Sequence, residues 1–269
     1  MSERVAPIVV KLGGRALAGA SAFAELAADL APLAGHVVLV HGGGPEVSAW
    51  SERLGLVPRF HQGRRVTDEA TLEVATAVLA GLANKRLVVA LAAHGIDAVG
   101  LAGLDGGIVL AVPHRDAATL GAVGAVAGVQ PALLWALLSA GRTPVIASIG
   151  AHEGALLNLN ADDVAAALAR GLGAQALVLL SDAPGLVLGG KVTARLDPDA
   201  ADRARAGDEV SAGMGPKLEA AAGAVRGGVS RAWIAAWSGP GTLGALLAGN
   251  GAGTCITAAS IPQEAPHGH

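Results

Sequence analysis

The chain has 269 residues, of which 52% are hydrophobic and only 15% are charged, so it can bury a sizeable core and is not intrinsically disordered. A net charge of −3 and an aromatic content of 2% argue against nucleic-acid binding, which favours basic surfaces and stacking platforms. No apolar stretch approaches the roughly 20 residues that cross a bilayer, and the single cysteine, Cys255, permits no internal disulfide. We therefore expect a cytoplasmic protein without membrane contact.

The first third of the chain predicts alternating strands and helices. Apolar, β-branched residues predict strands over 8–12 and 36–40, and an amphipathic helix around 23–30 separates them. Pro45 suits the first turn of the next helix. Thr67-Asp68-Glu69 then opens a long helix with one apolar side.

The remaining sequence continues this alternation and predicts the overall architecture. Strands are expected over 97–101, 143–149, 176–180 and 230–235, helices over 131–140, 161–171 and 214–225, short hairpins over 106–129, and a hairpin turn at Gly189-Gly190. Continuous apolar strands separated by helices are typical of a mostly parallel open sheet sandwiched by helices. The sequence therefore predicts an α/β fold with two lobes, residues 1–173 and 174–269.

Three predicted strand ends are rich in glycine and are followed by helices. They are 11–14 (KLGG), 41–44 (HGGG) and 181–185 (SDAPG). In open α/β sheets ligands bind beyond the carboxyl ends of the strands, where glycine lets backbone N–H groups approach an anion. Each cluster alone could be a simple turn in a chain with 39 glycines. Lys11 beside the first cluster, together with Lys217 in a second Gly-Lys element, favours phosphate binding.

Several common active-site motifs are absent from the sequence. There is no phosphate-binding P-loop motif and no nucleophile elbow, and the histidines lack the spacing of zinc ligands. Gly42 and Gly44 begin a dinucleotide-binding fingerprint, but Val47 stands where its third glycine would be. A dinucleotide-dependent oxidoreductase therefore rests only on the sheet pattern and this incomplete fingerprint.

Two polar segments have both a structural and a functional interpretation. Asn160 can cap the helix that begins at Ala161, but capping does not explain Asn158, whose alternate spacing favours a shared binding role. Arg64 and Arg65 precede a predicted helix. Either could be a solvated surface arginine, whereas Arg65 could hold a substrate carboxylate with two hydrogen bonds.

The order of these motifs from Ile8 to Thr257 resembles the acetylglutamate kinases, a group within the amino-acid kinase superfamily. The segments that carry the resemblance are KLGG (11–14), HGGG (41–44), GRRVTD (63–68), LANKRLV (82–88), AVGLAGLDG (98–106), PVIASIG (144–150), LNLNADDVA (157–165), LLSDAPGLV (179–187) and GMGPK (213–217). KLGG is shared with carbamate, aspartate and uridylate kinases, whereas the ordered set is more specific. The resemblance implies transfer of the ATP γ-phosphoryl group to the side-chain carboxylate of N-acetyl-L-glutamate, the second step of arginine biosynthesis.

The resemblance also implies roles for particular residues. The catalytic group comprises Lys11 and Lys217, which stabilise the transferring phosphoryl group, and Asp162, which organises both lysines. The substrate-binding group comprises Gly43, Gly44, Arg65 and Asn158. The nucleotide-binding group comprises Gly13, Gly14, Asp182, Ala183, Pro184, Gly185, Leu186, Val187, Glu209, Val210 and Ser211. The N-terminal lobe is expected to bind the amino acid and form a homodimer, and the C-terminal lobe to bind ATP, with Mg²⁺ held mainly by phosphates and water.

One position departs from the family pattern. Leu104 stands where the family often has lysine, and the resulting GLDG also occurs in kinases of a carrier-linked aminoadipate in lysine biosynthesis. Phosphorylation of aminoadipate is therefore an alternative, and a non-catalytic amino-acid or nucleotide sensor on the same fold is a more remote one. The chain starts close to its first strand, without room for the extra helix of hexameric, arginine-inhibited members. We therefore expect a dimer that arginine does not inhibit.

Overall fold

The computed structural model describes residues 5–13, 20–211 and 213–258, and one eight-stranded sheet forms its centre, in the order β14-β16-β15-β11-β1-β2-β8-β5. All neighbouring strands run parallel except β15 and β16. The strands are β1 (Ile8–Leu12), β2 (Val37–His41), β5 (Ala98–Ala102), β8 (Thr143–Ala147), β11 (Ala176–Ser181), β14 (Arg195–Leu196), β15 (Arg231–Ala236) and β16 (Thr254–Thr257). The predicted mostly parallel α/β fold is confirmed.

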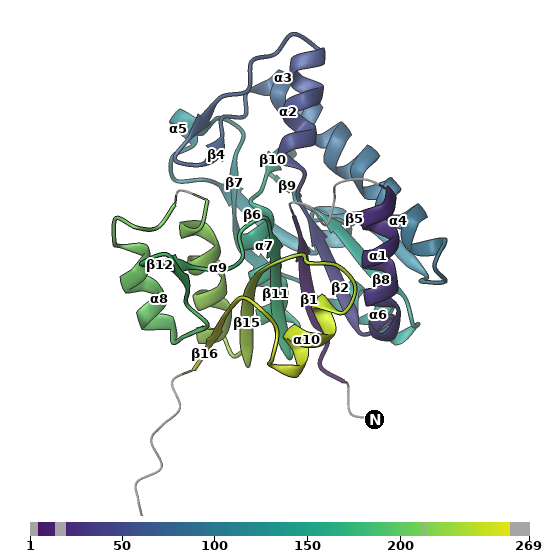
Figure 1. Ribbon diagram of the computed structural model, residues 1–269. Helices are drawn as coiled ribbons and strands as arrows, with labels where there is room; N and C mark the ends of the chain where they lie inside the picture. Colours follow the sequence, from purple (N-terminus) through teal and green to yellow (C-terminus); the bar gives the residue numbers. More distant parts are fainter. Residues whose placement is uncertain (1–4, 14–19, 212, 259–269) are drawn as a thin grey trace, which may run out of the picture.

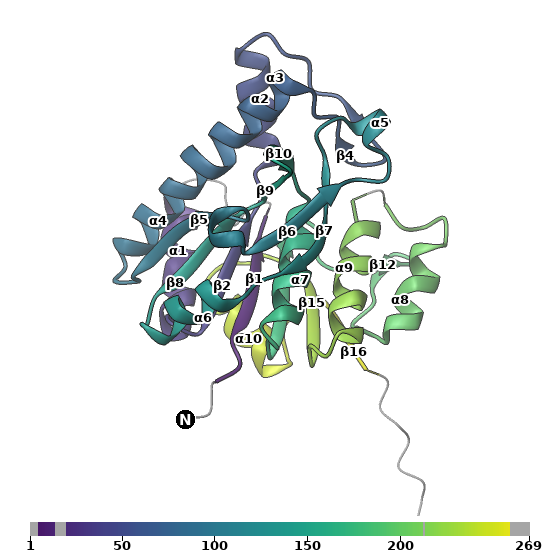
Figure 2. The ribbon, with the colours of Figure 1, turned by 180° about the vertical axis from the view of Figure 1, so that it is seen from behind.

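Helices cover both faces of the sheet. Figure 1 shows α1, α4 and α10 in front of the sheet, and Figure 2, seen from behind, shows α6, α7 and α9 on the other face. Their bounds, with those of the neighbouring η2 and α8, are α1 (Ala20–Leu30), η2 (Ala31–Leu33), α4 (Asn84–Ala92), α6 (Ala132–Ser139), α7 (Ala161–Gly171), α8 (Pro198–Arg205), α9 (Gly215–Arg226) and α10 (Thr242–Ala248).

The alternation of side chains along β1 decides which residue reaches which helix layer. Val9 packs in the core formed with α7 and α9, whereas Val10 and Leu12 pack in the core formed with α1, α4 and α10. Since side chains two residues apart lie on the same face of a strand, Lys11 projects to the side of α7 and α9. The sheet therefore directs this lysine toward the helices that carry Asp162 and Lys217.

Smaller elements gather beyond the carboxyl ends of the parallel strands. Figure 1 shows α2, α3, α5, β4 and β10 at the top of the molecule. The bounds of these elements and of the remaining hairpins and turns are α2 (Gly44–Arg53), β3 (Phe60–His61), β4 (Arg64–Arg65), α3 (Glu69–Thr76), η3 (Ala77–Ala83), η4 (Asp105–Gly107), β6 (Val109–Pro113), α5 (Ala117–Leu120), β7 (Gly124–Val129), β9 (Ile149–His152), β10 (Ala155–Asn158), β12 (Val187–Leu188) and β13 (Lys191–Val192). The predicted hairpins over 106–129 and at Gly189-Gly190 are confirmed by the antiparallel pairs β6–β7 and β12–β13.

One long helix of the structure is apolar. The consecutive segments α3, η3 and α4 form a helix over Glu69–Ala92 whose length and composition would also suit a membrane span. Its Leu87 and Leu91 are 1% exposed and pack with α1 against the sheet, and the buried Asn84 hydrogen-bonds to sheet carbonyl groups. We interpret it as a core helix of the α/β fold.

The structure corrects the predicted element list in a few places. The strand expected over 143–149 is divided at Ser148 between β8 and β9. The helices α8 and α10 and the strand β16 were not predicted. The sheet continues across the predicted lobe boundary, since β1 pairs with both β2 and β11. The division into residues 1–173 and 174–269 stays a prediction.

Candidate active site

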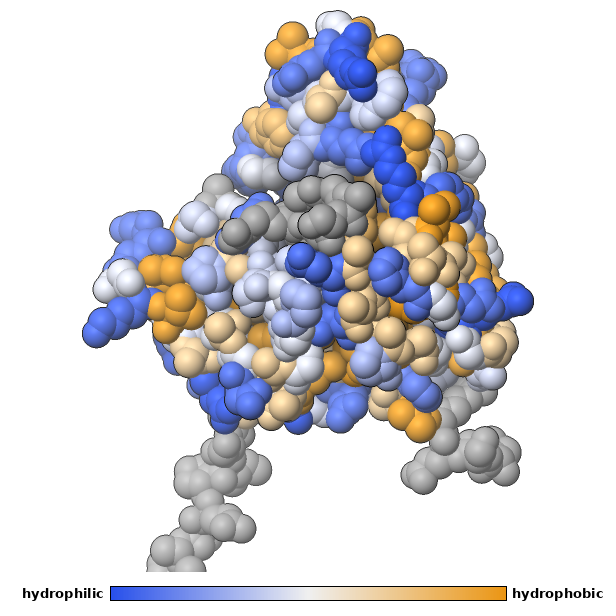
Figure 3. Space-filling view, turned by 45° about the vertical axis from the view of Figure 1, so that its right-hand side comes forward, coloured by the Kyte–Doolittle hydropathy of each residue, from blue (hydrophilic) through white to orange (hydrophobic). Residues whose placement is uncertain are grey.

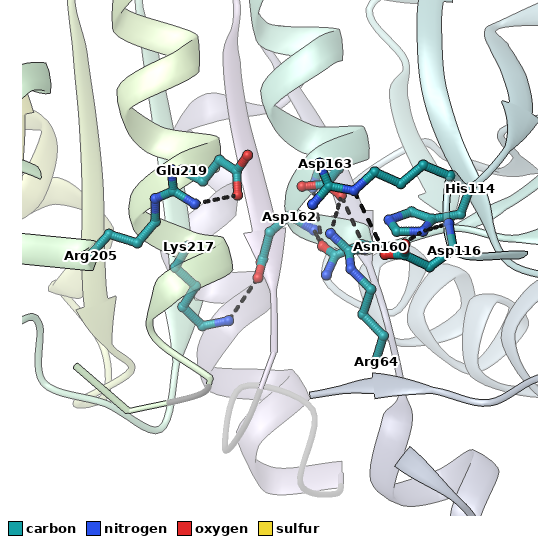
Figure 4. A network of polar contacts seen from close by, with 10 residues as sticks. Arg64, His114, Asp116, Asn160, Asp162, Asp163, Arg205, Lys217 and Glu219 are labelled. Carbon is teal, nitrogen blue, oxygen red and sulfur yellow. Dashed lines mark hydrogen bonds and ion pairs between the residues drawn. The ribbon is translucent and has the colours of Figure 1, made fainter. Parts of the chain in front are cut away.

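Two lysines from distant parts of the chain meet at one buried carboxylate. Lys11 Nζ lies 2.9 Å from Asp162 Oδ1, and Lys217 Nζ lies 2.8 Å from Asp162 Oδ2. Figure 4 shows Lys217 reaching from α9 toward Asp162 at the start of α7. The three side chains are only 11%, 16% and 6% exposed. Together they carry a net charge of +1, so the cluster attracts a further anion.

The electrostatics of Asp162 follow from this arrangement. Burial alone would raise the pKa of its carboxyl group, but Lys11 and Lys217 more than compensate and hold that pKa below its ordinary value. The carboxylate is therefore ionised at neutral pH. An ionised Asp162 can fix the positions of both ammonium groups, as the resemblance implies.

Local sequence features place the three side chains. The Asn160 side chain caps α7 by accepting hydrogen bonds from the Asp162 and Asp163 amides at 2.8 and 3.2 Å, which sets Asp162 in the first turn. Pro216 lies in the first turn of α9, immediately before Lys217. A Cβ at residue 13 would lie 2.7 Å from Lys11 Nζ, so Gly13 makes room for the lysine.

The predicted substrate-binding residues line one cavity of about 190 Å³. Gly43, Gly44, Arg65 and Asn158 all contribute to its wall, and so does the capping residue Asn160. The capping role of Asn160 is confirmed, and its binding role stays a prediction.

Arg65 presents a guanidinium donor without a partner among the described residues in this wall. Its side chain is buried, and Nη2 donates to the Gly44 carbonyl oxygen and to Ser48 Oγ, both at 2.7 Å. Nη1 is buried and has no hydrogen-bond partner in the described part of the chain. Burial lowers the pKa of Arg65, but a guanidinium stays charged in proteins. A buried cationic donor without a partner calls for an anionic ligand.

A larger cavity of about 1410 Å³ lies on the other side of the glycine segment. Lys11, Gly13 and Asp182 line it, and residues 42–44 belong to the walls of both cavities. Lys11, which Asp162 links to Lys217, therefore borders the larger cavity, and Ala161, the neighbour of Asp162, lines the smaller one. Gly14 lies outside the described residues.

The predicted nucleotide loops are only partly gathered around this space. Of these residues beyond β11, Asp182 lines the larger cavity. The Leu186 side chain is buried in the core and its amide donates to Thr254 Oγ1 at 2.8 Å, so its side chain is structural. Glu209 Oε2 accepts a hydrogen bond from the Gly189 amide at 2.9 Å, which ties its loop to the β12–β13 turn. The nucleotide-binding role of residues 182–187 and 209–211 stays a prediction.

Two further polar groups at the site were not predicted. Arg64 Nη2 lies 3.3 Å from Asp163 Oδ2, so the β3–β4 hairpin is linked to the helix turn that carries Asp162 (Figure 4). Burial raises the pKa of Asp163, although Arg64 opposes this. Ser48 supports Arg65 from one helical turn beyond Gly44, a spacing that could have indicated its role. The departure at Leu104 packs against the apolar cluster of α2, α3 and η3 and does not line the smaller cavity.

Within residues 5–13, 20–211 and 213–258, no group of three His, Cys, Asp or Glu side chains could hold a metal ion. The site is thus built from cations and backbone amides, which suit anionic ligands such as phosphates and carboxylates.

This fold, with a buried cationic cluster at the carboxyl ends of its strands, is that of a protein that handles small anionic ligands. A sequence profile of the amino acid kinase family matches residues 6–236, and the chain belongs to this family.

Curated relatives agree with this assignment. The chain is 45% identical over 236 residues to an acetylglutamate kinase of Methanopyrus kandleri, covering 84% of this chain and 93% of that one. It is 42% identical over 249 residues to an acetylglutamate kinase of Rubrobacter xylanophilus, covering 93% and 96%.

Solved structures share the fold. An N-acetylglutamate synthase from Neisseria gonorrhoeae, solved with coenzyme A and N-acetyl-glutamate, has a TM-score of 0.81 and 27% identity over 95% of this chain, which spans 60% of that protein. A Giardia carbamate kinase has a TM-score of 0.69 at 15% identity over 95% of this chain and all of that one, a likeness of fold alone. The α/β architecture expected from the resemblance is confirmed.

Proposed function

We infer that the chain catalyses the acetylglutamate kinase reaction, in which the γ-phosphoryl group of ATP passes to the side-chain carboxylate of N-acetyl-L-glutamate. Relatives with this activity in their names are 42–45% identical over most of the chain. The observation that carries the inference is the bridging of Lys11 and Lys217 by Asp162, next to two cavities that share the glycine wall 42–44.

The smaller cavity fits the acetylated amino acid. The unpartnered Nη1 of Arg65 would hold the α-carboxylate in a charge-assisted hydrogen bond. Asn158, which lines the same cavity, donates from Nδ2 to Thr67 Oγ1 at 3.1 Å. Its side-chain oxygen would then accept a hydrogen bond from the substrate. These contacts would direct the side-chain carboxylate of the substrate toward residues 43 and 44.

The chemical step requires positioning and charge neutralisation. A side-chain carboxylate oxygen forms a bond to the γ-phosphorus, the bond from that phosphorus to the β,γ-bridging oxygen breaks, and ADP leaves with the electron pair. The attacking carboxylate is already ionised at neutral pH, so no proton moves and no general base is needed. Lys11, Lys217 and the Gly43 and Gly44 amides would stabilise the oxygens whose charge changes.

The residues fit a polyphosphate better than they fit a metal. ATP supplies the transferred phosphoryl group, and the net positive cluster with Gly13 and Gly43 beside it suits its oxygens. The described residues provide no carboxylate cluster for Mg²⁺, so we assign that ion to the phosphates and water.

A hydroxamate-trapping assay tests the function directly, because hydroxylamine captures acyl phosphates. With ATP, we expect product from N-acetylglutamate at a rate well above that from N-acetylaminoadipate, aspartate or carbamate. A higher kcat/KM for N-acetylaminoadipate would move the proposal to the aminoadipate kinases. ATP-dependent product from none of the four would favour a non-catalytic sensor.

We also propose a cytoplasmic homodimer formed through residues 1–173. Support comes from the resemblance to the acetylglutamate kinases; on η3 and α4, Leu82 and Val89 are 39% and 68% exposed, although both also line the larger cavity. Figure 3 turns the right-hand side of Figure 1 forward, and apolar residues lie together right of its centre. Sedimentation velocity would show twice the mass of one chain, and a monomer at micromolar concentration would contradict the proposal. An unchanged rate in millimolar arginine is the matching expectation for regulation.

A further inference from the structure

His41 is a buried histidine that the chemistry above does not use. It ends β2 immediately before the glycine segment 42–44, and its side chain is fully buried. Nδ1 lies 2.9 Å from the Gly42 carbonyl oxygen, and Nε2 lies 3.1 Å from Asn84 Nδ2. The imidazole ring of His41 thus connects the backbone of the glycine segment to the side chain of Asn84 on α4.

The surroundings of Asn84 determine which way its amide points. Nδ2 lies 2.9 Å from the Val145 carbonyl oxygen and 3.3 Å from that of Leu101, and Oδ1 lies 3.0 Å from Lys85 Nζ. A carbonyl oxygen only accepts and an ammonium only donates, so the reverse orientation would leave like groups facing one another. The amide nitrogen of Asn84 therefore faces His41.

The orientation of Asn84 in turn fixes the tautomer of His41. An amide nitrogen donates, so Nε2 of His41 must accept, and the ring proton resides on Nδ1. Burial lowers the pKa of His41 to about 4, which keeps the ring neutral at pH 7. Nδ1–H therefore donates to the Gly42 carbonyl oxygen, and the peptide between Gly42 and Gly43 has a fixed orientation.

The helix that supplies Asn84 also supports Gly43. Its central segment η3 (Ala77–Ala83) is a π-helix, a form that occurs often at functional sites, and Asn84 follows it directly. Leu79, in the same segment, approaches so closely that a Cβ at Gly43 would lie 2.8 Å from Leu79 Cδ2. The extra residue of a π-turn changes the helix phase, so that Leu79 meets the glycine and Asn84 meets the histidine.

We propose that His41 and Asn84 are positioning residues for the phosphoryl-transfer step, which hold the Gly42–Gly43 peptide so that the Gly43 and Gly44 amides face the reacting oxygens. The inference rests on the proposed function. These two amides lie at the amino end of α2, where no preceding helical turn accepts them. Consecutive glycines have the widest choice of backbone conformations, and loss of the His41 bond would let this peptide rotate away from the reacting group.

Two substitutions of His41 separate the two sides of the ring. In His41→Asn, Nδ2 can occupy the place of Nδ1 and keep the bond to Gly42. In His41→Gln, the longer side chain reaches the place of Nε2, keeps a partner in Asn84 and leaves the Gly42 carbonyl oxygen without its donor. We expect kcat within about threefold of wild type for His41→Asn and at least about tenfold lower for His41→Gln, with the KM for N-acetylglutamate changed less than kcat in both.

The tautomer supplies a readout that does not depend on activity. In the ¹⁵N-histidine spectrum of the wild-type protein at pH 7, we expect His41 to carry its proton on Nδ1. A proton on Nε2, or equal kcat for the Asn and Gln variants at equal thermal stability, would overturn the proposal. If wild type does not phosphorylate N-acetylglutamate while the Nδ1–H signal is present, the proposed function fails instead. If both variants unfold, the wild-type spectrum decides alone.

Discussion

Among the described residues Lys217 has one ion-pair partner, Asp162, which also pairs with Lys11, and this sharing determines the effect of removing Lys217. In Lys217→Ala, Asp162 keeps Lys11 at 2.9 Å, so the carboxylate remains paired and the protein should fold. The transferring phosphoryl group loses one of two ammonium groups. Loss of one such electrostatic contact costs about 3 kcal/mol, or about a hundredfold in rate. We expect steady-state kinetics to show kcat lowered by at least about tenfold, with a smaller change in KM.

Arg226→Ala is the matched control for Lys217→Ala. Arg226 lies on the same helix α9, is exposed, and pairs with Asp199 and Asp202 away from the site. Its removal should leave kcat unchanged. An unchanged kcat in folded Lys217→Ala would remove that lysine from the chemical step.

His41 gives the protein a specific dependence of stability on pH. Its pKa is lowered to about 4 in the folded state, against an ordinary value of 6.5 in the unfolded chain. Between these values the unfolded chain binds the proton and the folded protein does not, so the free energy of unfolding falls as pH decreases from 6.5 to 4. The full loss is about 3 kcal/mol. Urea titrations at pH 7 and 4.5 should show that His41→Asn loses less stability on acidification than wild type, and an equal loss would contradict the assignment.

At the scale of the element, the cap of α7 links stability to activity. Asn160 accepts two amide hydrogen bonds, and replacing such a cap by alanine costs about 1 kcal/mol. Because Asp162 lies in the first turn of α7, fraying of this end also displaces the bridge between the lysines. Asn160→Ala should therefore lower both the melting temperature and kcat.

Asp197→Ala distinguishes this effect from general destabilisation. Asp197 caps α8 in the same manner, accepting from the Ala200 amide at 2.7 Å, but α8 carries none of the site residues. We expect a similar loss of stability and an unchanged kcat. A comparable fall in kcat in both variants would mean that the activity follows stability alone.

The elements show where sequence patterns succeed and where they fail. The strands of the sheet centre are continuous apolar runs, and their burial on both faces makes them recognisable. The helix α8 packs in the core only through small residues, Ala201 and Ala204, which give no strong apolar pattern, although Asp197-Pro198 is a recognisable helix start. The π-helix η3 left no sign in the sequence, because its segment Ala77–Ala83 has the apolar composition of an ordinary core helix. Asn84 was therefore noticed as part of a motif but could not be given a partner.

At the scale of the whole molecule, the sequence indicates the charged residues of the proposed site but not how they meet. Lys11, Asp162 and Lys217 are far apart in the chain, and only the parallel sheet with α7 and α9 on one face brings their charges within 2.9 Å. Arg65 could be chosen over Arg64 from the family pattern alone. The structure supplies a physical reason, since Arg65 is buried and its Nη1 has no hydrogen-bond partner among the described residues, whereas Arg64 pairs with Asp163.

The two cavities predict that ligands stabilise the molecule independently. A ligand at 100 times its Kd adds about 2.7 kcal/mol to the free energy of unfolding, which is roughly 5 °C in melting temperature for a chain of this size. We expect N-acetylglutamate and a non-hydrolysable ATP analogue each to raise the melting temperature by such an amount. Arg65→Ala should abolish the shift by the amino acid, because that ligand loses its carboxylate partner, and should retain the shift by the nucleotide. If Arg65→Ala instead abolished the rise in melting temperature caused by the nucleotide, Arg65 would belong to the nucleotide site and not to the amino-acid site.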